Sequence, residues 1–337
     1  MHRGWIAALV LAGTWLMAGI APAQDAPLTP PATAPLSFEQ WLDRLKQEAT
    51  EQGIRPAVFD AALAGVQPLP RVIELDRKQP EGTITFAQYA KNIVTPKRVA
   101  DGKKLLREHR TLLGEVSKKY GVPPRFLVAL LGIETNYGRL TGTYRVVDAL
   151  ATLAYDGRRS AYFRKELLAA LTILDRHNLA PDMLKGSWAG AMGQDQFMPT
   201  AYLKYAQDWD GDGRADLWKS QGDVFASAAN YLSTVGWNGT LTWGREVKLP
   251  AGGRVAGEAS LDPAKGRKLA DWHKLGVRRS DGKPLPKGDH PAWLVLPDGP
   301  SGRAFLVYEN YRTVMDWNRS TYFATTVGLL ADRIGEG

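Results

Sequence analysis

The 337-residue sequence contains 44% apolar and 23% charged residues, which excludes a disordered or collagen-like chain. Its length exceeds the roughly 250 to 300 residues at which a single hydrophobic core stops growing, so more than one structural unit is expected. The formal net charge of +8 favours an acidic partner, and the absence of cysteine excludes disulfides and a lipid-modified cysteine.

Residues 1–23 have the pattern of a secretory signal peptide. Arg3 precedes an apolar run from Trp5 to Ile20, and the small-residue pattern Ala21-Pro22-Ala23 follows. The apolar run is shorter than the roughly 20 residues that a spanning helix needs, so an uncleaved anchor is the weaker alternative. The sequence predicts a periplasmic protein that contacts the membrane only through this segment.

The next segment, 24–36, is rich in Pro, Ala and Thr and is predicted to be a flexible leader. At Ser37 the pattern becomes helical. Ser37 and Gln40 are spaced as a capping box, and Phe38, Trp41 and Leu45 follow at helical intervals. We therefore predict an N-terminal helical region over 37–100.

Further helices are predicted at 96–120, from Pro123-Pro124 to Glu134, and at 162–174. In the second of these, Leu127, Leu130, Leu131 and Glu134 fall on one face, which places a carboxylate on an apolar stripe. Desolvation there raises the pKa of a carboxyl group, as a general acid near neutral pH requires. The alternative is a structural Glu134 paired with Arg139 or Arg145.

The segment 185–199 is dense in small residues and side-chain amides. Glycine and alanine allow a ligand to approach the backbone, and Ser187 and Gln196 are suited to bind hydroxyl and acetamido groups. Composition alone favours the alternative, a tight structural turn.

An acidic loop begins at Asp208 with the pattern D-x-D-G-D-G-x-x-D, which matches an EF-hand calcium loop. Lys219 stands where the bidentate glutamate is usual, so another carboxylate must close the site, and Asp223 is the nearest one downstream. The alternative is an Asp-Gly turn held by hydrogen bonds of the aspartate side chains.

The residue pattern changes near Trp243. From there, short apolar runs alternate with Gly, Pro, Asp and Lys, as is typical of strands and loops. Helical periodicity returns over 321–334, which predicts a β-rich insertion at 241–308 and a final part of the core at 309–337. The five histidines lack zinc-site spacing, and neither a G-x-S-x-G elbow nor a P-loop occurs.

Together the motifs resemble the lytic murein transglycosylase B family, glycoside hydrolase family 103, from about Leu36 to the C-terminus. The motifs that carry the resemblance are Gly132-Ile133-Glu134-Thr135-Asn136-Tyr137-Gly138, the segment 147–154, Gly190-Ala191-Met192-Gly193 with Gln196-Phe197-Met198-Pro199, and the Asp208 loop. The resemblance implies a mainly helical α+β fold, with a lysozyme-like core over 101–240, an added helical domain and a small inserted β domain.

The resemblance also implies a lyase that cleaves peptidoglycan between N-acetylmuramic acid and N-acetylglucosamine without water and leaves 1,6-anhydromuramoyl ends. Glu134 is then acid and afterwards base, and the sugar is contacted by Ser187, Gln196, Tyr231 and Asn318. The implied structural Ca²⁺ is held by Asp208, Asp210, Asp212, the Arg214 carbonyl and Asp223. Cell-wall synthesis enzymes are candidate partners, whereas nucleic acid and an organic cofactor are not expected.

Two residues depart from the family pattern. Asp195 stands between Gln194 and Gln196, where we expect it to alter substrate contacts without touching Glu134. Arg214, at the carbonyl-donating position of the loop, departs as well. Two other functions stay open. A hydrolytic muramidase would need a second carboxylate such as Asp148 or Asp195. A non-catalytic, calcium-stabilised peptidoglycan-binding protein would need no catalytic residue.

Overall fold

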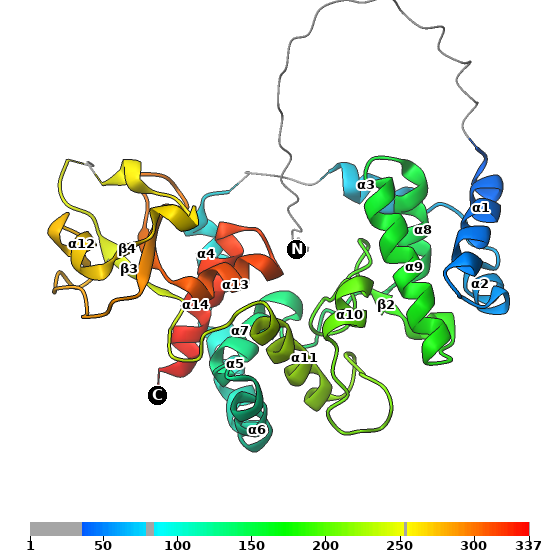
Figure 1. Cartoon of the computed structure of the whole chain (residues 1–337), viewed down its shortest axis with the longest axis horizontal. Coiled ribbons are helices and arrows are strands. Elements are labelled where there is room, and N and C mark those ends of the chain that lie inside the picture. Colours follow the sequence, from blue (N-terminus) through cyan, green and yellow to red (C-terminus); the bar gives the residue numbers. More distant parts are fainter. Residues whose placement is uncertain (1–35, 79–83, 253–254, 337) are drawn as a thin grey trace, which may run out of the picture. The chain divides into compact units, whose positions relative to one another are not determined.

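The computed structural model describes residues 36–78, 84–252 and 255–336. The predicted signal peptide and all of the predicted leader except Leu36 lie outside the described residues. The described chain is mainly helical with a small β-sheet (Figure 1), so the expected α+β class is confirmed. It forms two compact units, and neither is continuous in sequence: the smaller unit contains residues 36–77 and 143–190, and the larger unit contains the remainder of the described residues.

The smaller unit consists of helices and one short antiparallel strand pair. Its elements are α1 (Phe38–Glu51), α2 (Pro56–Leu63), α3 (Pro70–Arg77), β1 (Tyr144–Arg145), α8 (Val146–Asp156), α9 (Ser160–Arg176), the 3₁₀ helix η1 (Pro181–Met183) and β2 (Lys185–Gly186). Ser37 accepts from the backbone of Gln40 while Gln40 caps the Ser37 backbone, so the predicted capping box is confirmed. The helix pair α8 and α9 forms the main packing contact of this unit, with α2 against both.

The larger unit contains most of the helices and one five-stranded sheet. Its helices are α4 (Phe86–Ile93), α5 (Pro96–Glu108), α6 (Arg110–Tyr120), α7 (Pro124–Thr135), α10 (Pro199–Tyr205), α11 (Gln221–Thr234), α12 (Leu269–Lys274), α13 (Glu309–Trp317) and α14 (Thr321–Gly335), with 3₁₀ helices η2 (Ala256–Glu258) and η3 (Pro263–Lys265). Its strands are β3 (Gly244–Lys248), β4 (Arg267–Lys268), β5 (Arg278–Arg279), β6 (Pro291–Val295) and β7 (Ala304–Val307).

The sheet is antiparallel with strand order β4-β6-β7-β3-β5, and its strands all lie within the segment where short strands were expected. Its register places Trp293 opposite Val307 and Arg245 opposite Leu306. Leu294 and Leu306 are buried on one face with Trp272 in a separate small core. The chain then returns through α13 to α14, which packs against α5 and α7 as the return of helical periodicity predicted.

The single helix expected over 96–120 is two helices. Residue His109 ends α5 with φ −109° and ψ 25°, and α6 begins directly after it. Hydrophobic periodicity alone does not reveal a break at a single residue. Of the described residues, none belongs to a helix with both the length and the apolar character that crossing a membrane requires.

Candidate active site

Glu134 lies in the last turn of α7, a helix whose interior is almost entirely buried. Leu127, Leu130 and Leu131 are at most 1% exposed, and they pack with α14 and α11 in the main core of the larger unit. The helix ends at Asn136, which has a left-handed backbone with φ 51°. The carboxyl group of Glu134 is therefore carried by a rigid, buried element and lies where that element stops.

Contacts of the motif residues 132–138 hold the turn after Glu134 in place. A Cβ on Gly132 would stand 2.8 Å from the ring of Tyr137, and one on Gly138 would stand 2.6 Å from Gln194 Oε1. Tyr137, itself left-handed with φ 62°, donates its hydroxyl to the Arg98 carbonyl at 2.6 Å. The two glycines of the motif thus leave space for side chains that fix the turn.

Trp317 is the direct partner of Glu134. Its indole Nε1 donates to Glu134 Oε1 at 2.8 Å. Burial raises the pKa of Glu134 to about 7, and the hydrogen bond from Trp317 opposes part of that rise. The alternative in which an arginine neutralises Glu134 is not what the structure shows, because Arg139 pairs with Asp101 and Arg145 pairs with Asp148 and Asp182.

Aromatic rings surround this hydrogen bond. Trp317 lies 4.8 Å from Tyr231 and 5.2 Å from Phe197 between ring centroids, and Tyr231 lies 4.5 Å from Tyr205. The Tyr231 hydroxyl donates to the Asp316 carbonyl at 2.8 Å, which fixes its ring. These four partly or fully buried rings make an apolar wall next to the acid, a surface suited to the apolar face of a sugar.

Part of the segment 185–199 forms a loop next to the end of α7, and hydrogen bonds hold this loop in place. Met192 and Phe197 pair as an isolated antiparallel bridge, and the Gln194 backbone donates to Leu217 at 2.7 Å. Thr135, the neighbour of Glu134, donates its hydroxyl to the Gln194 carbonyl at 3.0 Å. The side-chain nitrogen of Gln196 donates to the carbonyls of Thr141 and Gly193. The tight turn and the predicted binding segment are thus the same feature.

Asp195 differs from what we expected. It is 0% exposed, so it does not form a surface contact, and both of its carboxyl oxygens lack a hydrogen-bond partner among the described residues. Burial first, and the charge of Glu134 second, raise the pKa of Asp195 well above its ordinary value. Asp195 is therefore part of the buried interior and not of the surface that a substrate meets.

The other predicted contact residues divide between the two units. Glu134, Gln196, Tyr231 and Asn318 belong to the larger unit, where Asn318 directly follows Trp317 and accepts from the Ser320 backbone at 3.1 Å. Ser187 follows β2 in the smaller unit. Its contribution to the same site stays a prediction.

Three residues near Glu134 were missed as site residues in the sequence. Trp317 and Phe197 are separated from Glu134 by long stretches of chain. Tyr89 on α4 was missed as well: burial first, then the charge of Glu134, raise its pKa to about 12. The hints were the positions of Trp317 and Phe197 directly beside the predicted Asn318 and Gln196, because one sequence carries no signal for a contact formed by the fold.

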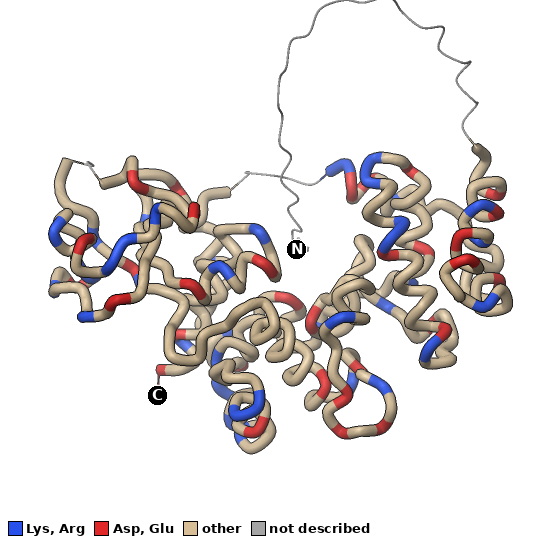
Figure 2. Tube along the Cα trace, viewed as in Figure 1, with Lys and Arg blue, Asp and Glu red and all other residues tan. Residues whose placement is uncertain are grey.

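The acidic loop lies between α10 and α11, where Figure 2 shows several Asp residues along the trace. One carboxylate oxygen from each of Asp208, Asp210 and Asp212 lies within 4.8 Å of the others, and all three side chains are exposed. Such a set of oxygen donors fits a hard divalent cation such as Ca²⁺. Three of the five predicted ligands are therefore brought together by their side chains.

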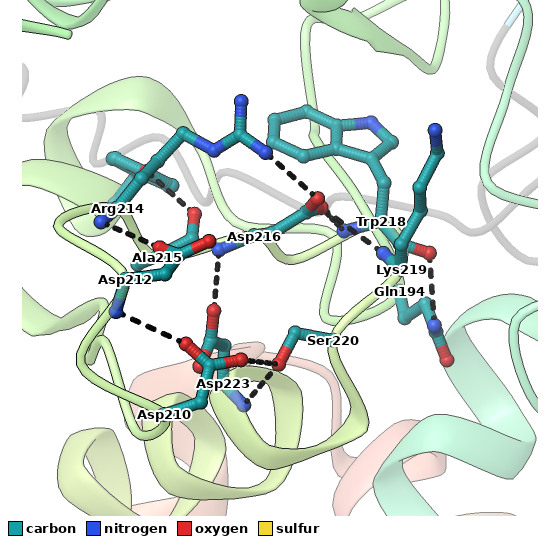
Figure 3. A network of polar contacts seen from close by, with 11 residues as sticks. Gln194, Asp210, Asp212, Arg214, Ala215, Asp216, Trp218, Lys219, Ser220 and Asp223 are labelled. Carbon is teal, nitrogen blue, oxygen red and sulfur yellow. Dashed lines mark hydrogen bonds and ion pairs between the residues drawn. The ribbon is translucent and has the colours of Figure 1, made fainter.

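Hydrogen bonds of the aspartate side chains shape this loop (Figure 3). Asp208 accepts from the backbones of Gly211, Asp212 and Gly213. The buried Asp223 accepts from Trp209 at 2.8 Å and Asp216 at 2.7 Å, so it ties both ends of the loop to α11. The calcium loop and the hydrogen-bonded Asp-Gly turn are therefore compatible interpretations of the motif, because the turns preorganise the cluster of three carboxylates.

Comparison with known proteins identifies the family of this chain. The family model described as transglycosylase SLT domain matches residues 37–332. The chain is 33% identical over 250 residues to the membrane-bound lytic murein transglycosylase B of Escherichia coli (strain K12), which covers 74% of this chain and 67% of that protein.

Solved structures agree as well. The crystal structure of SltB3 from Pseudomonas aeruginosa in complex with NAG-anhNAM-pentapeptide is 46% identical and matches with a TM-score of 0.85, over 89% of this chain and 80% of that one. The Escherichia coli lytic transglycosylase Slt35 in complex with calcium is 30% identical, with a TM-score of 0.73 over 88% and 92% of the two chains. This chain therefore belongs to the transglycosylase SLT domain family and is a lytic murein transglycosylase.

Proposed function

We propose that this enzyme uses Glu134 alone to cleave the β-1,4 bond between N-acetylmuramic acid and N-acetylglucosamine in peptidoglycan. Glu134 protonates the glycosidic oxygen of the leaving sugar. Its carboxylate then takes the proton of the C6 hydroxyl as that oxygen attacks C1, which closes a 1,6-anhydro ring. No water is consumed, and Glu134 returns to its acid form.

The observation that carries this proposal is the pKa of Glu134, which burial raises to about 7. A group with that pKa is protonated often enough to act as an acid near neutral pH and is basic enough to recover the proton. A hydrolase would need a second carboxylate as base or nucleophile. Asp195 does not suit that role, because it is fully buried and burial raises its pKa well above the ordinary value.

We place the substrate against the aromatic wall of Phe197, Tyr231 and Trp317, with Gln196, Asn318 and Ser187 as its polar contacts. The apolar faces of sugar rings pack well on such side chains. The relative SltB3 has been solved with NAG-NAM-pentapeptide and with NAG-anhNAM-pentapeptide, which are a fragment and a product of this kind of cleavage. A role in cell-wall turnover follows from that substrate.

Product analysis tests the proposal. Purified sacculi are digested with the enzyme, and the soluble muropeptides are identified by mass spectrometry. We expect 1,6-anhydro ends from the wild type, none from Glu134→Gln, and wild-type products from Glu115→Gln, a matched change on the exposed face of α6. Products with only reducing ends would show hydrolysis, and binding without any product would support a non-catalytic role.

We also propose that the acidic loop holds a structural Ca²⁺ through Asp208, Asp210, Asp212, the carbonyl of Arg214 and Asp223. The support is the cluster of three carboxylates, the preorganised loop and the calcium complex of the relative Slt35. These residues belong to the loop and to the first turn of α11, so an ion held by them would stabilise the fold there.

Export to the periplasm is the third proposal. It rests on the signal-peptide pattern of residues 1–23 and on the location of the substrate outside the cytoplasm. Fractionation of cells that express a C-terminally tagged protein tests it. Recovery of a shortened protein in the periplasmic fraction is expected, and a full-length protein retained in the cytoplasm would refute export.

A further inference from the structure

A cavity of about 630 Å³ lies in the larger unit among α4, α14 and the ends of β3, β5 and β7. Pockets that bind small ligands have volumes of roughly 300 to 1,000 Å³, so this cavity is large enough to hold one. None of the described residues that line it belongs to the candidate active site. The proposed reaction therefore gives this cavity no role.

A second cavity, of about 350 Å³, continues from the first. The two cavities share Glu246 and Arg303, and the second extends beside β3 to Lys248 and Leu249. Together they form one groove, which follows the sheet beyond the end of β7. A groove of this length suits a chain molecule better than a single small ion.

Charged side chains make up much of the lining of the first cavity, and cations outnumber acids. The cations are Lys91, Arg245, Arg279, Arg303 and Arg333, and the acids are Glu246, Asp332 and Glu336. A concave surface with an excess of positive charge raises the local concentration of anions. The ligand that this lining favours therefore carries a negative charge.

Three of the five cations are already paired with acids. Arg303 donates Nε and Nη2 to the two carboxylate oxygens of Glu246 at 2.8 Å each, a fork that satisfies both groups. The other pairs are looser. The three pairs are Arg303 with Glu246, Arg333 with Glu336 and Arg279 with Asp281.

The third acid belongs to a fixed part of the cavity wall. Asp332 on α14 accepts from Trp243 Nε1 at 2.9 Å and lies 3.7 Å from Nη1 of Arg125. Trp243 is 1% exposed, and a Cβ on Gly328 would stand 2.1 Å from its ring, so α14 and the start of β3 are in close contact. This wall is therefore formed before any ligand binds.

Lys91 and Arg245 are the two lining cations that keep free donors. Arg245 donates Nε to the Tyr308 hydroxyl at 2.7 Å, which orients the guanidinium, and no residue of the described chain bonds to its terminal nitrogens. The exposed Lys91 on α4 has no ion-pair partner within the same described ranges. A guanidinium edge fits both oxygens of a carboxylate, and an ammonium group adds a second positive charge.

We propose that this groove binds the peptide of a peptidoglycan strand, with a carboxylate of the peptide held by Arg245 and Lys91. The inference rests on the proposed function. Such a peptide is a chain molecule that ends in a carboxylate, so it matches both the length and the charge of the groove. The strand is then held at a second place besides Glu134, and two linked contacts bind more tightly than either alone.

Binding of the isolated peptide tests the site. The probe is the peptide that an amidase releases from sacculi, free of sugar, and calorimetry measures its Kd. We expect Lys91→Gln combined with Arg245→Gln to weaken binding by about tenfold or more, because two charged contacts are lost. The control combines Arg107→Gln with Lys118→Gln, which removes the same charge from exposed positions on α5 and α6 and changes Kd by less than about twofold.

Kinetics separates a peptide attached to the strand from a released one. KM and kcat are measured on glycan strands that carry peptides and on strands stripped of them. In the Lys91→Gln and Arg245→Gln double variant, KM rises by about fivefold to tenfold on peptide-bearing strands only, and kcat stays at the wild-type value on both substrates. A wild-type KM on peptide-bearing strands would show that the groove does not hold the strand.

Three binding results would overturn the proposal: no binding of the peptide by the wild type, equal binding by the wild type and the double variant, or binding of inorganic phosphate in place of the peptide. Melting temperatures are recorded for all variants. If the double variant does not fold, Lys91→Gln alone, a change at an exposed side chain, weakens binding by about threefold. Failure of the proposed function appears differently, as missing 1,6-anhydro ends while the peptide still binds.

Discussion

Trp317 at the end of α13 donates its indole N–H to Glu134 at the end of α7, across 183 positions of sequence and 2.8 Å of space. This bond favours the ionised form of Glu134, against the burial that disfavours it. The same indole ring belongs to the aromatic wall on which we place the sugar. Trp317 therefore connects substrate contact with the proton affinity of the acid.

Replacement of Trp317 by Phe tests this connection. The ring contacts remain, but the carboxylate loses a donor, so the pKa of Glu134 rises and the alkaline limb of kcat/KM moves up by about one pH unit. Trp272→Phe removes an indole bond to the Ala292 carbonyl in the small core and serves as the control. If the alkaline limb of kcat/KM moves equally in Trp317→Phe and Trp272→Phe, or moves toward lower pH in Trp317→Phe, the role of Trp317 is contradicted.

The raised pKa of Glu134 predicts a pH-dependent cost in stability. The folded protein binds this proton more tightly than the unfolded chain. The resulting stabilisation is fully present below the ordinary glutamate pKa of 4.5 and is lost as pH rises through about 7. Glu134→Gln removes the free-energy cost of ionising this buried carboxyl group. We expect it to stabilise the protein at pH values above 7 by on the order of 2 kcal/mol and to have little effect in acid.

Thermal unfolding of both proteins across the pH range measures this difference. Glu115→Gln on the surface of α6 is the matched control, for which we expect no pH-dependent gain. A constant difference between Glu134→Gln and the wild type at every pH would show that Glu134 titrates normally.

Gly132 is predicted to be essential for packing rather than for chemistry. A Cβ at this position meets the Tyr137 ring at 2.8 Å, so Gly132→Ala displaces the ring and its bond to Arg98. We expect a destabilisation of about 1 to 3 kcal/mol and a lower kcat, because the turn after Glu134 moves.

Gly114→Ala provides the control, because nothing lies within 4 Å of a Cβ there. This exposed helical position gains about 1 kcal/mol from the better helix former. Denaturant titration of both variants gives the comparison. Equal stability changes of the same sign would show that the Gly132 contact is not limiting.

Chelation tests the calcium proposal. If the loop holds Ca²⁺, a chelator lowers the melting temperature and added Ca²⁺ restores it, because the ion binds the folded state. Asp208→Asn weakens the response, since Asp208 organises the loop and supplies a ligand. Asp281→Asn, in the turn after β5, leaves it unchanged. A melting temperature that is indifferent to chelator in the wild type would argue against an occupied loop.

Tyr231 is expected to act through its ring. Tyr231→Phe keeps the contacts with Trp317 and Tyr205 and loses only the bond to the Asp316 carbonyl, so KM changes little. Tyr231→Ala removes part of the aromatic wall and raises KM for glycan strands by about tenfold, as for the loss of one stacked ring. Steady-state kinetics of both variants measures KM. A wild-type KM in Tyr231→Ala would remove Tyr231 from the substrate contacts.

Local patterns in the sequence were sufficient for several features. The capping box at Ser37, the helix that begins at Pro124, the carboxylate on its apolar stripe and the aspartate spacing of the loop all depend on interactions within a few residues. The break at His109 was not predicted, because hydrophobic periodicity does not reveal an interruption at a single residue.

The sequence by itself determined which carboxyl group was a candidate acid, which loop was acidic enough for calcium and which family the motifs resemble. Only the tertiary structure decided that Trp317 is the partner of Glu134, that Arg139 and Arg145 pair elsewhere, and that Asp195 is buried beside the acid. The physical reason is that hydrogen-bond partners and desolvation are set by residues far apart in the chain. The charge state of a group depends on those surroundings, and a single sequence does not encode them locally.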